Sequence, residues 1–145
     1  MYKSTLLPVI IGFLAVIGCS APQDFPANYK QDQIHFGQGG GFTGGVTYYA
    51  LLEDGRVFQR GQLDTIFTYL EKWTPGFTEQ MFSNYNSLHL QEMDFNEPGD
   101  LYYFVNYKSP GDPDHRLTWG RSGFKPDHNV VRFYNLLFKS IKSKS

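Results

Sequence analysis

The sequence predicts an α+β domain, an antiparallel sheet built from β-hairpins with helices packed on one face. Three observations lead to this fold class. Segments rich in β-branched and aromatic residues occur in pairs joined by short turns. Aromatic residues make up 17% of the chain, which favours a sheet with an aromatic core. The expected helices do not alternate singly with the strands, which argues against a parallel sheet. The expected order is β-ββ-αα-ββ-α.

The first strands are expected at residues 33–37 and 46–52, on either side of a glycine-rich run at 39–45. Residues 53–55 end in Asp54-Gly55, a dipeptide typical of hairpin turns, and residues 56–60 form the returning strand. The next segment, 63–73, places Leu63, Ile66, Phe67 and Leu70 at helical spacing, and Trp73 continues this stripe. We therefore expect a helix there, ended by Pro75-Gly76.

The second half of the domain is expected to hold another hairpin between two helices. A helix is expected to start at Thr78 as N-cap, with Phe77 packing on Phe82 as a hydrophobic staple. Residues 101–107 are the clearest strand, and 115–120 pair back after a loop at 109–114. The last helix begins at about Asp127, and one apolar stripe runs along it, formed by Val130, Phe133, Tyr134, Leu137, Phe138 and Ile141.

The N-terminus has the pattern of a bacterial lipoprotein signal. Lys3 precedes an apolar segment at 6–15, and residues 16–19 fit a lipobox that ends in Cys19. The apolar segment is shorter than the ~20 residues that span a bilayer. An ordinary cleaved signal peptide and an uncleaved anchor remain alternatives. We expect a signal at 1–18, the lipidated Cys19 with a tether at 19–32, and one domain at 33–145.

Composition narrows the classes of partner. Cys19 is the only cysteine, so no disulfide can form within the chain. The net charge is −1, without the basic surface that a nucleic-acid partner requires. Lysines concentrate only at positions 139, 142 and 144. They either complement the end of the last helix or contact anionic lipid headgroups. The expected location is the cell envelope, on its periplasmic or surface face.

The glycine run is the candidate binding loop, formed by Gly39, Gly40, Gly41, Phe42, Thr43 and Gly44. It contains the letters of a dinucleotide fingerprint, but a strand and not a helix is expected after it, which argues against nucleotide binding. One interpretation is a strained connection where side chains do not fit. The other is a loop whose amides and Phe42 meet a partner. The side chain of Phe42 is either buried in the core or exposed to solvent.

Other candidate sites have weaker signals. Trp119 and Arg121 could line a shallow pocket, but the favoured interpretation of Trp119 is a residue that anchors the core. No two histidines have metal-ligand spacing, and no Gly-x-Ser-x-Gly motif occurs, so we expect no metal, cofactor or catalytic residue. Acidic residues fall in turn-rich segments, with Asp112 and Asp114 as an example.

Several motifs together resemble a known group. They are F-G-x-G-G-G-F-T-G at 36–44, L-L-E-D-G-R-V-F at 51–58, P-G-D-x-Y at 98–102 and L-T-W-G at 117–120. The chain is similar in these motifs to small uncharacterised lipoproteins of Bacteroidota and related bacteria. This resemblance implies an envelope location and an architecture, and no reaction or functional residue.

These observations favour a lipid-anchored envelope protein with a non-enzymatic binding domain. It would be attached to the membrane through Cys19, with a protein as its possible partner. Two alternatives stay open. One is a hydrolase of envelope polymers, which needs two carboxylates about 5–10 Å apart. The other is a purely structural lipoprotein, which predicts no deep pocket and no large exposed apolar patch.

Overall fold

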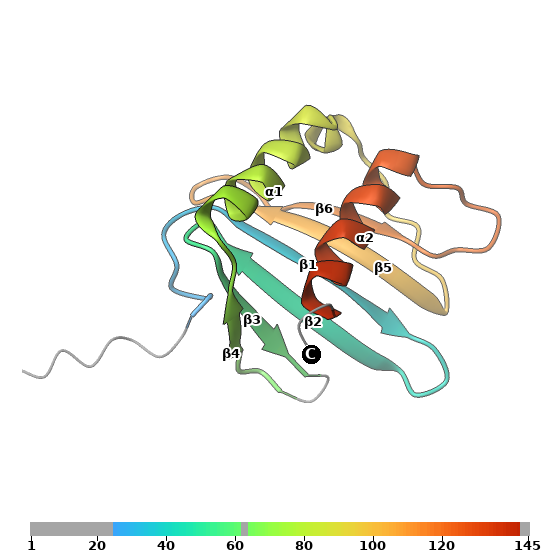
Figure 1. Cartoon of the computed structure of the whole chain (residues 1–145). Helices are drawn as coiled ribbons and strands as arrows, with labels where there is room; N and C mark the ends of the chain where they lie inside the picture. The colour runs from blue at the N-terminus through green and yellow to red at the C-terminus, as the bar shows by residue number, and fades with distance from the viewer. Residues whose placement is uncertain (1–24, 62–63, 143–145) are drawn as a thin grey trace, which may run out of the picture.

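A six-stranded antiparallel sheet is the main element of the computed structural model, which describes residues 25–61 and 64–142 (Figure 1). The strand order is β4-β3-β2-β1-β5-β6. Each pair of neighbours is antiparallel, which confirms the expected α+β class. The strands are β1 (Gln33–Gly40), β2 (Gly45–Leu52), β3 (Arg56–Arg60), β4 (Thr68–Lys72), β5 (Leu101–Lys108) and β6 (His115–Trp119).

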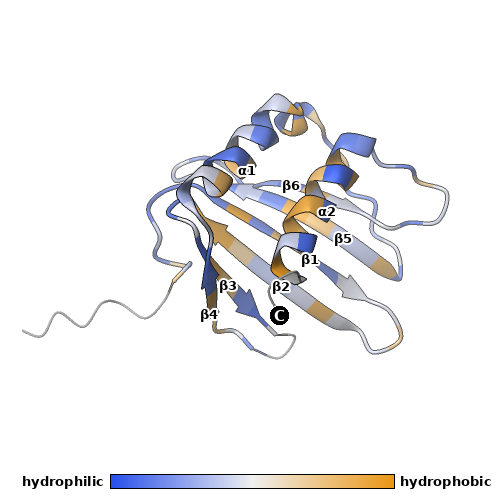
Figure 2. Ribbon diagram, viewed as in Figure 1, coloured by the Kyte–Doolittle hydropathy of each residue, from blue (hydrophilic) through white to orange (hydrophobic). Residues whose placement is uncertain are grey.

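Two α-helices in the described residues, α1 (Pro75–Ser87) and α2 (His128–Lys142), cover one face of this sheet (Figure 1). A short 3-10 helix, η1 (Leu90–Glu92), follows α1. The start of α2 is as predicted, because Asp127 Oδ1 accepts a hydrogen bond from the Asn129 amide at 2.8 Å. Figure 2 shows hydrophobic residues in α2 and along the central strands. The predicted stripe is buried at Val130, Phe133, Tyr134, Leu137 and Ile141, and Phe138 packs against the same core.

Alternation along the strands divides the sheet into two faces. Ile34 and Phe36 of β1 point to the helices and belong to the main core. The side chain of His35 points to the opposite side, which we call the far face. A second, smaller cluster lies on this far face, where Ala50, Leu52 and Phe58 pack with Phe25, Tyr29 and Phe67. Both faces are therefore covered at least in part.

The helix predicted at 63–73 is wrong, because this segment contains strand β4 (Thr68–Lys72). Its apolar residues do not share one face. Phe67 contacts His35 and Tyr48 on the far face, at 5.9 and 5.7 Å between ring centroids, whereas Trp73 lies in the main core. Pairing with the edge of β3 decides the conformation, which helical spacing alone could not reveal. Leu63 lies outside the described residues.

The helix α1 starts earlier than predicted. Thr74 and not Thr78 is its N-cap, and Pro75, expected to end a helix, occupies the first turn. Proline suits this position because its missing N–H has no helical partner there. The Thr78 hydroxyl donates to the Thr74 carbonyl at 2.9 Å inside the helix. Phe77 packs edge-on against Trp73, with 5.1 Å between ring centroids.

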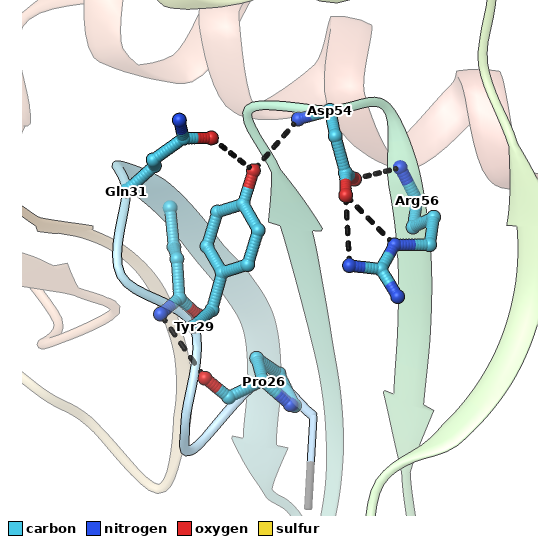
Figure 3. Close-up of polar contacts among 6 residues, drawn as sticks. Pro26, Tyr29, Gln31, Asp54 and Arg56 are labelled. Carbon is cyan, nitrogen blue, oxygen red and sulfur yellow. Dashed lines mark hydrogen bonds and ion pairs between the residues drawn. The ribbon is translucent and has the colours of Figure 1, made fainter. Parts of the chain in front are cut away.

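Residues 25–32, expected to be part of the tether, pack on the domain. Figure 3 shows Tyr29 beside the β2–β3 turn, where its hydroxyl donates to Gln31 Oε1 at 3.0 Å and accepts from the Asp54 amide at 3.1 Å. Asp54 in turn holds the Arg56 guanidinium at 2.7 Å. That guanidinium lies 4.2 Å from the centroid of the Phe25 ring. Residues 25–32 therefore belong to the folded domain and not to a tether.

Candidate functional site

The β1–β2 hairpin ends in an exposed turn of residues 41–44, and here the expected binding loop is found. The Gly44 amide donates to the Gly41 carbonyl at 3.1 Å, and the Gly41 amide donates to the Asp100 carbonyl at 2.7 Å. Gly41 and Gly44 have φ values of +77° and +64°, a region that side chains disfavour. The turn is thus closed by its own backbone and tied at its base to the chain before β5.

Phe42 stands out fully from this turn, with a relative exposure of 108%. Of the two interpretations of the Phe42 side chain, exposure to solvent is the observed one. A single exposed apolar side chain is common at protein surfaces. Phe42 differs in its setting, because it lies at the tip of a hydrogen-bonded hairpin and not along a strand or helix. Covering its ring would remove apolar surface from water without refolding the loop.

Three glycines of strand β1, Gly37, Gly39 and Gly40, lie where a side chain would not fit. A Cβ on Gly37 would lie 2.0 Å from the Thr47 carbonyl oxygen, and one on Gly39 would lie 2.5 Å from the Tyr102 ring. A Cβ on Gly40 would lie 1.9 Å from the Asp100 carbonyl oxygen. These positions need glycine because a neighbouring ring or backbone fills the space. The glycine run therefore combines both expected roles, a tightly packed base and an exposed turn.

A shallow open depression of about 410 Å³ adjoins the hairpin. Besides glycines, its walls carry amide and hydroxyl groups together with Val46, Arg60 and Leu101. The polar side chains are those of Gln38, Thr43, Thr47 and Gln59. Such groups donate and accept hydrogen bonds at neutral pH but do not titrate. The depression can therefore hold a polar part of a partner beside Phe42, and its neutral side chains supply no acid or base.

His35 forms the centre of a buried polar chain on the far face. Gln33 Nε2 donates to the Pro26 carbonyl at 3.2 Å, so its Oε1 accepts from His35 Nε2 at 2.8 Å. His35 Nδ1 then accepts from the Tyr48 hydroxyl at 2.9 Å. Burial, followed by the charge of Lys108, lowers the pKa of His35 to about 3. A neutral imidazole with both nitrogens engaged ties β1 to β2 and to the N-terminal segment.

Two arginines extend over aromatic rings of the same face. The Arg60 guanidinium lies 4.4 Å from the Tyr48 ring centroid, and the Arg116 guanidinium lies 4.1 Å from that of Phe104. Phe104 is fully buried although it points away from the helices. Cation–π contacts and the stems of long side chains thus cover this face.

Trp119 and Arg121 do not form a pocket together. Trp119 is buried between Tyr103 and Tyr134, with centroid distances of 5.9 and 5.4 Å. Arg121 is exposed and pairs with Glu97 at 2.9 Å. Trp119 is therefore a core residue, the second of the two interpretations.

The acidic residues of the turns interact mainly with neighbouring polar groups. Asp114 pairs with Lys108 at 3.1 Å, and Glu97 pairs with Arg121. Asp32 accepts hydrogen bonds from the Tyr107 and Ser109 hydroxyls at 2.6 and 2.7 Å. Among residues 25–61 and 64–142, no group of three or more His, Cys, Asp or Glu side chains is placed to hold a metal ion. These contacts make Asp32, Glu97 and Asp114 parts of the local structure.

One polar cluster was not singled out from the sequence. The Tyr85 hydroxyl bonds to His115 Nδ1, and His115 Nε2 donates to the Met93 carbonyl at 2.8 Å. Tyr107 stacks on Tyr85 at 4.5 Å and faces a depression of about 300 Å³. Ser109 lies nearby, but its hydroxyl donates to Asp32 and not to a histidine. Ser109 is therefore not the nucleophile of a serine–histidine pair, and no short sequence motif marks the members of this cluster.

Comparisons with known proteins add no relative: no family model matches this chain, and no curated protein matches it either. In the part of the chain that the structure describes, neither helix is long and apolar enough to cross a bilayer. Cys19 lies outside the described residues. The candidate site is the hairpin turn with the exposed Phe42 at its centre.

Proposed function

We propose that this protein is a lipid-anchored lipoprotein of the bacterial cell envelope whose domain binds a macromolecular partner without catalysing a reaction. The single observation that carries the binding role is the full exposure of Phe42 on a hairpin closed by its own backbone. A preformed turn loses little conformational freedom on binding, which favours its use as a contact element. The neighbouring depression offers amides and hydroxyls for the rim of such an interface.

The anchor is supported by the lipobox at 16–19 and by Cys19 as the only cysteine. The resemblance to Bacteroidota lipoproteins points to the same location. Two or three acyl chains would hold the protein to a leaflet, since each buried methylene contributes ~0.8 kcal/mol. The mass of the mature protein tests this part. We expect a diacylglyceryl adduct on Cys19 and its loss in Cys19→Ala; an unmodified N-terminus would contradict it.

The absence of catalysis is supported by the way the reactive side chains are occupied. His35 and His115 use both ring nitrogens in hydrogen bonds. Ser109 donates its hydroxyl to a carboxylate. Both histidines bond to a tyrosine hydroxyl, and neither pairs with a serine, which is the usual nucleophile–base arrangement of a hydrolase.

The binding role is tested by photo-crosslinking from the hairpin. A photoreactive residue at Thr43 in the full-length chain, expressed in its host, should give an adduct of defined mass. The same residue at Ser122, an exposed position after β6, is the matched control. We expect the Thr43 adduct to disappear when Phe42→Ala is added. An adduct that forms equally from both positions, or that persists in Phe42→Ala, would contradict the role of the hairpin.

A further inference from the structure

The two edges of the sheet differ in the described residues. At the β6 edge, the Thr118 amide donates to the Phe95 carbonyl at 3.3 Å, and the Glu97 amide donates to the Thr118 carbonyl at 2.8 Å. The segment around Asn96 thus covers that edge. The other terminal strand is β4. An exposed edge strand with apolar side chains promotes association with other chains, so the side chains of β4 bear on what this edge contacts.

Exposed large apolar side chains are concentrated in β4 and just before it. Ile66 is 72% exposed, Tyr69 is 55% exposed and Leu70 is 41% exposed. The pairing with β3 is irregular here: Val57 pairs with Glu71 and Phe58 with Tyr69, which leaves Leu70 as an extra residue. Such a bulge bends an edge strand and disfavours regular pairing with another strand. The exposed apolar side chains at β4 are therefore better suited to contact with lipid than to pairing with a strand of another chain.

Phe25, the first residue that the structure describes, packs on β3, the strand next to β4. Phe25 stacks on Phe58 at 6.4 Å, and Phe58 contacts Tyr69 at 5.8 Å between ring centroids. A fully extended chain from Cys19 to Phe25 reaches at most about 20 Å. From β3, where Phe25 packs, the edge strand β4 is one strand spacing away, whereas β6 is four spacings away, about 19 Å at ~4.8 Å per strand. The chain to Cys19 therefore starts nearer to β4 than to β6, which favours an orientation of the lipidated protein with the β4 side towards the membrane.

On the basis of the proposed acylation of Cys19, we infer that the β4 edge, with Ile66, Tyr69 and Leu70, rests on the lipid bilayer. Tyrosine is favoured at membrane interfaces because its ring is apolar and its hydroxyl polar. Ile66 and Leu70 would enter the boundary between headgroups and acyl chains. Lys30 and Lys72, both exposed on neighbouring segments, are available to lipid phosphates. The anchored domain would then have one defined orientation.

Site-directed spin labelling tests this orientation. Cys19 would be blocked by its thioether, so a cysteine introduced elsewhere is the only free thiol. The lipidated full-length variants Ile66→Cys and Leu70→Cys are labelled and reconstituted in vesicles of phosphatidylethanolamine and phosphatidylglycerol. Ser122→Cys, in an exposed loop beyond the opposite edge, is the control. All three positions are exposed, so the fold should be retained.

We expect the ratio of collisions with oxygen to collisions with a water-soluble nickel complex to be several-fold higher at positions 66 and 70 than at 122. Equal ratios at the three positions overturn the inference. Loss of access to both reagents at 66 and 70, with dipolar broadening between labels, also overturns it, because a second copy then covers β4. The mass of the labelled protein separates the two proposals: an unacylated Cys19 refutes the anchor, whereas equal ratios in acylated protein refute only the orientation.

Discussion

The hydroxyl of Tyr48 donates to Nδ1 of His35 at 2.9 Å, between two neighbouring strands on the far face. This bond requires a neutral imidazole, because the other nitrogen donates to Gln33. Burial raises the pKa of the Tyr48 hydroxyl, which keeps it a donor over the physiological range. The side-chain link between β1 and β2 on the far face therefore depends on the protonation state of His35.

Acid should destabilise the domain through His35. Its pKa falls from 6.5 to about 3 on folding, so the unfolded state binds the proton first as the pH decreases. The contribution of neutral His35 to the free energy of unfolding is complete above pH ~6.5. It is lost progressively towards pH ~3, at about 1.4 kcal/mol per pKa unit. Urea unfolding between pH 4.5 and 7 measures this slope. His35→Gln should flatten it; parallel slopes in the two proteins would refute the assignment.

Phe42→Ala should leave stability unchanged within about 0.5 kcal/mol, because the ring makes no buried contact that folding would lose. The matched control is Phe104→Ala, the same substitution at a fully buried ring, which should cost about 3–5 kcal/mol. Chemical denaturation of both variants checks the comparison. A large loss in Phe42→Ala would mean that the ring packs on the domain in solution.

Gly40→Ala should destabilise the protein more than Gly41→Ala. Both residues have positive φ, which costs an alanine roughly 1–2 kcal/mol. Only at Gly40 does the new methyl group also meet backbone, 1.9 Å from the Asp100 carbonyl oxygen, whereas nothing lies within 4 Å at Gly41. Denaturation midpoints of the two variants give the order directly. Equal losses would show that backbone strain alone governs the base of the hairpin.

Arg56→Ala should release the N-terminal segment. The guanidinium joins Asp54 to the Phe25 ring, and both contacts disappear with it. Burial raises the pKa of the Asp54 carboxyl, but hydrogen bonds and charge from Arg56 outweigh this effect and hold the pKa below its usual value. We expect faster amide exchange at Tyr29 and Asp54. Arg121→Ala, which removes an exposed ion pair with Glu97, serves as control and should leave both amides protected.

Much of the fold follows from local patterns. The Asp54-Gly55 turn joins β2 to β3 as predicted, with Gly55 at φ +92°. The stripe from Val130 to Ile141 defines α2, and Asp127 caps it. These features depend on neighbours within a few residues, so the sequence carries them directly. The candidate loop was also recognisable, because glycines at this density require a conformational or packing reason.

The direction in which single side chains point was not predictable. Phe42 and Trp119 were each compatible with a core or a surface role. In the structure, Phe42 points to solvent, and Trp119 packs between Tyr103 and Tyr134. The polar chain from Pro26 through His35 to Tyr48 joins residues from three segments, and no local motif encodes it.

The sequence by itself determined the class of the fold, its turns, the amphipathic α2 and the lipobox motif that ends at Cys19, since all of these are short-range patterns. Only the tertiary structure decided that the segment before α1 is strand β4 and that Phe25 packs on β3, the neighbour of β4. The physical reason is that apolar residues at helical spacing lie on one face only if the segment forms a helix. Whether it is helical depends on the strand edge of β3, formed by residues outside that segment.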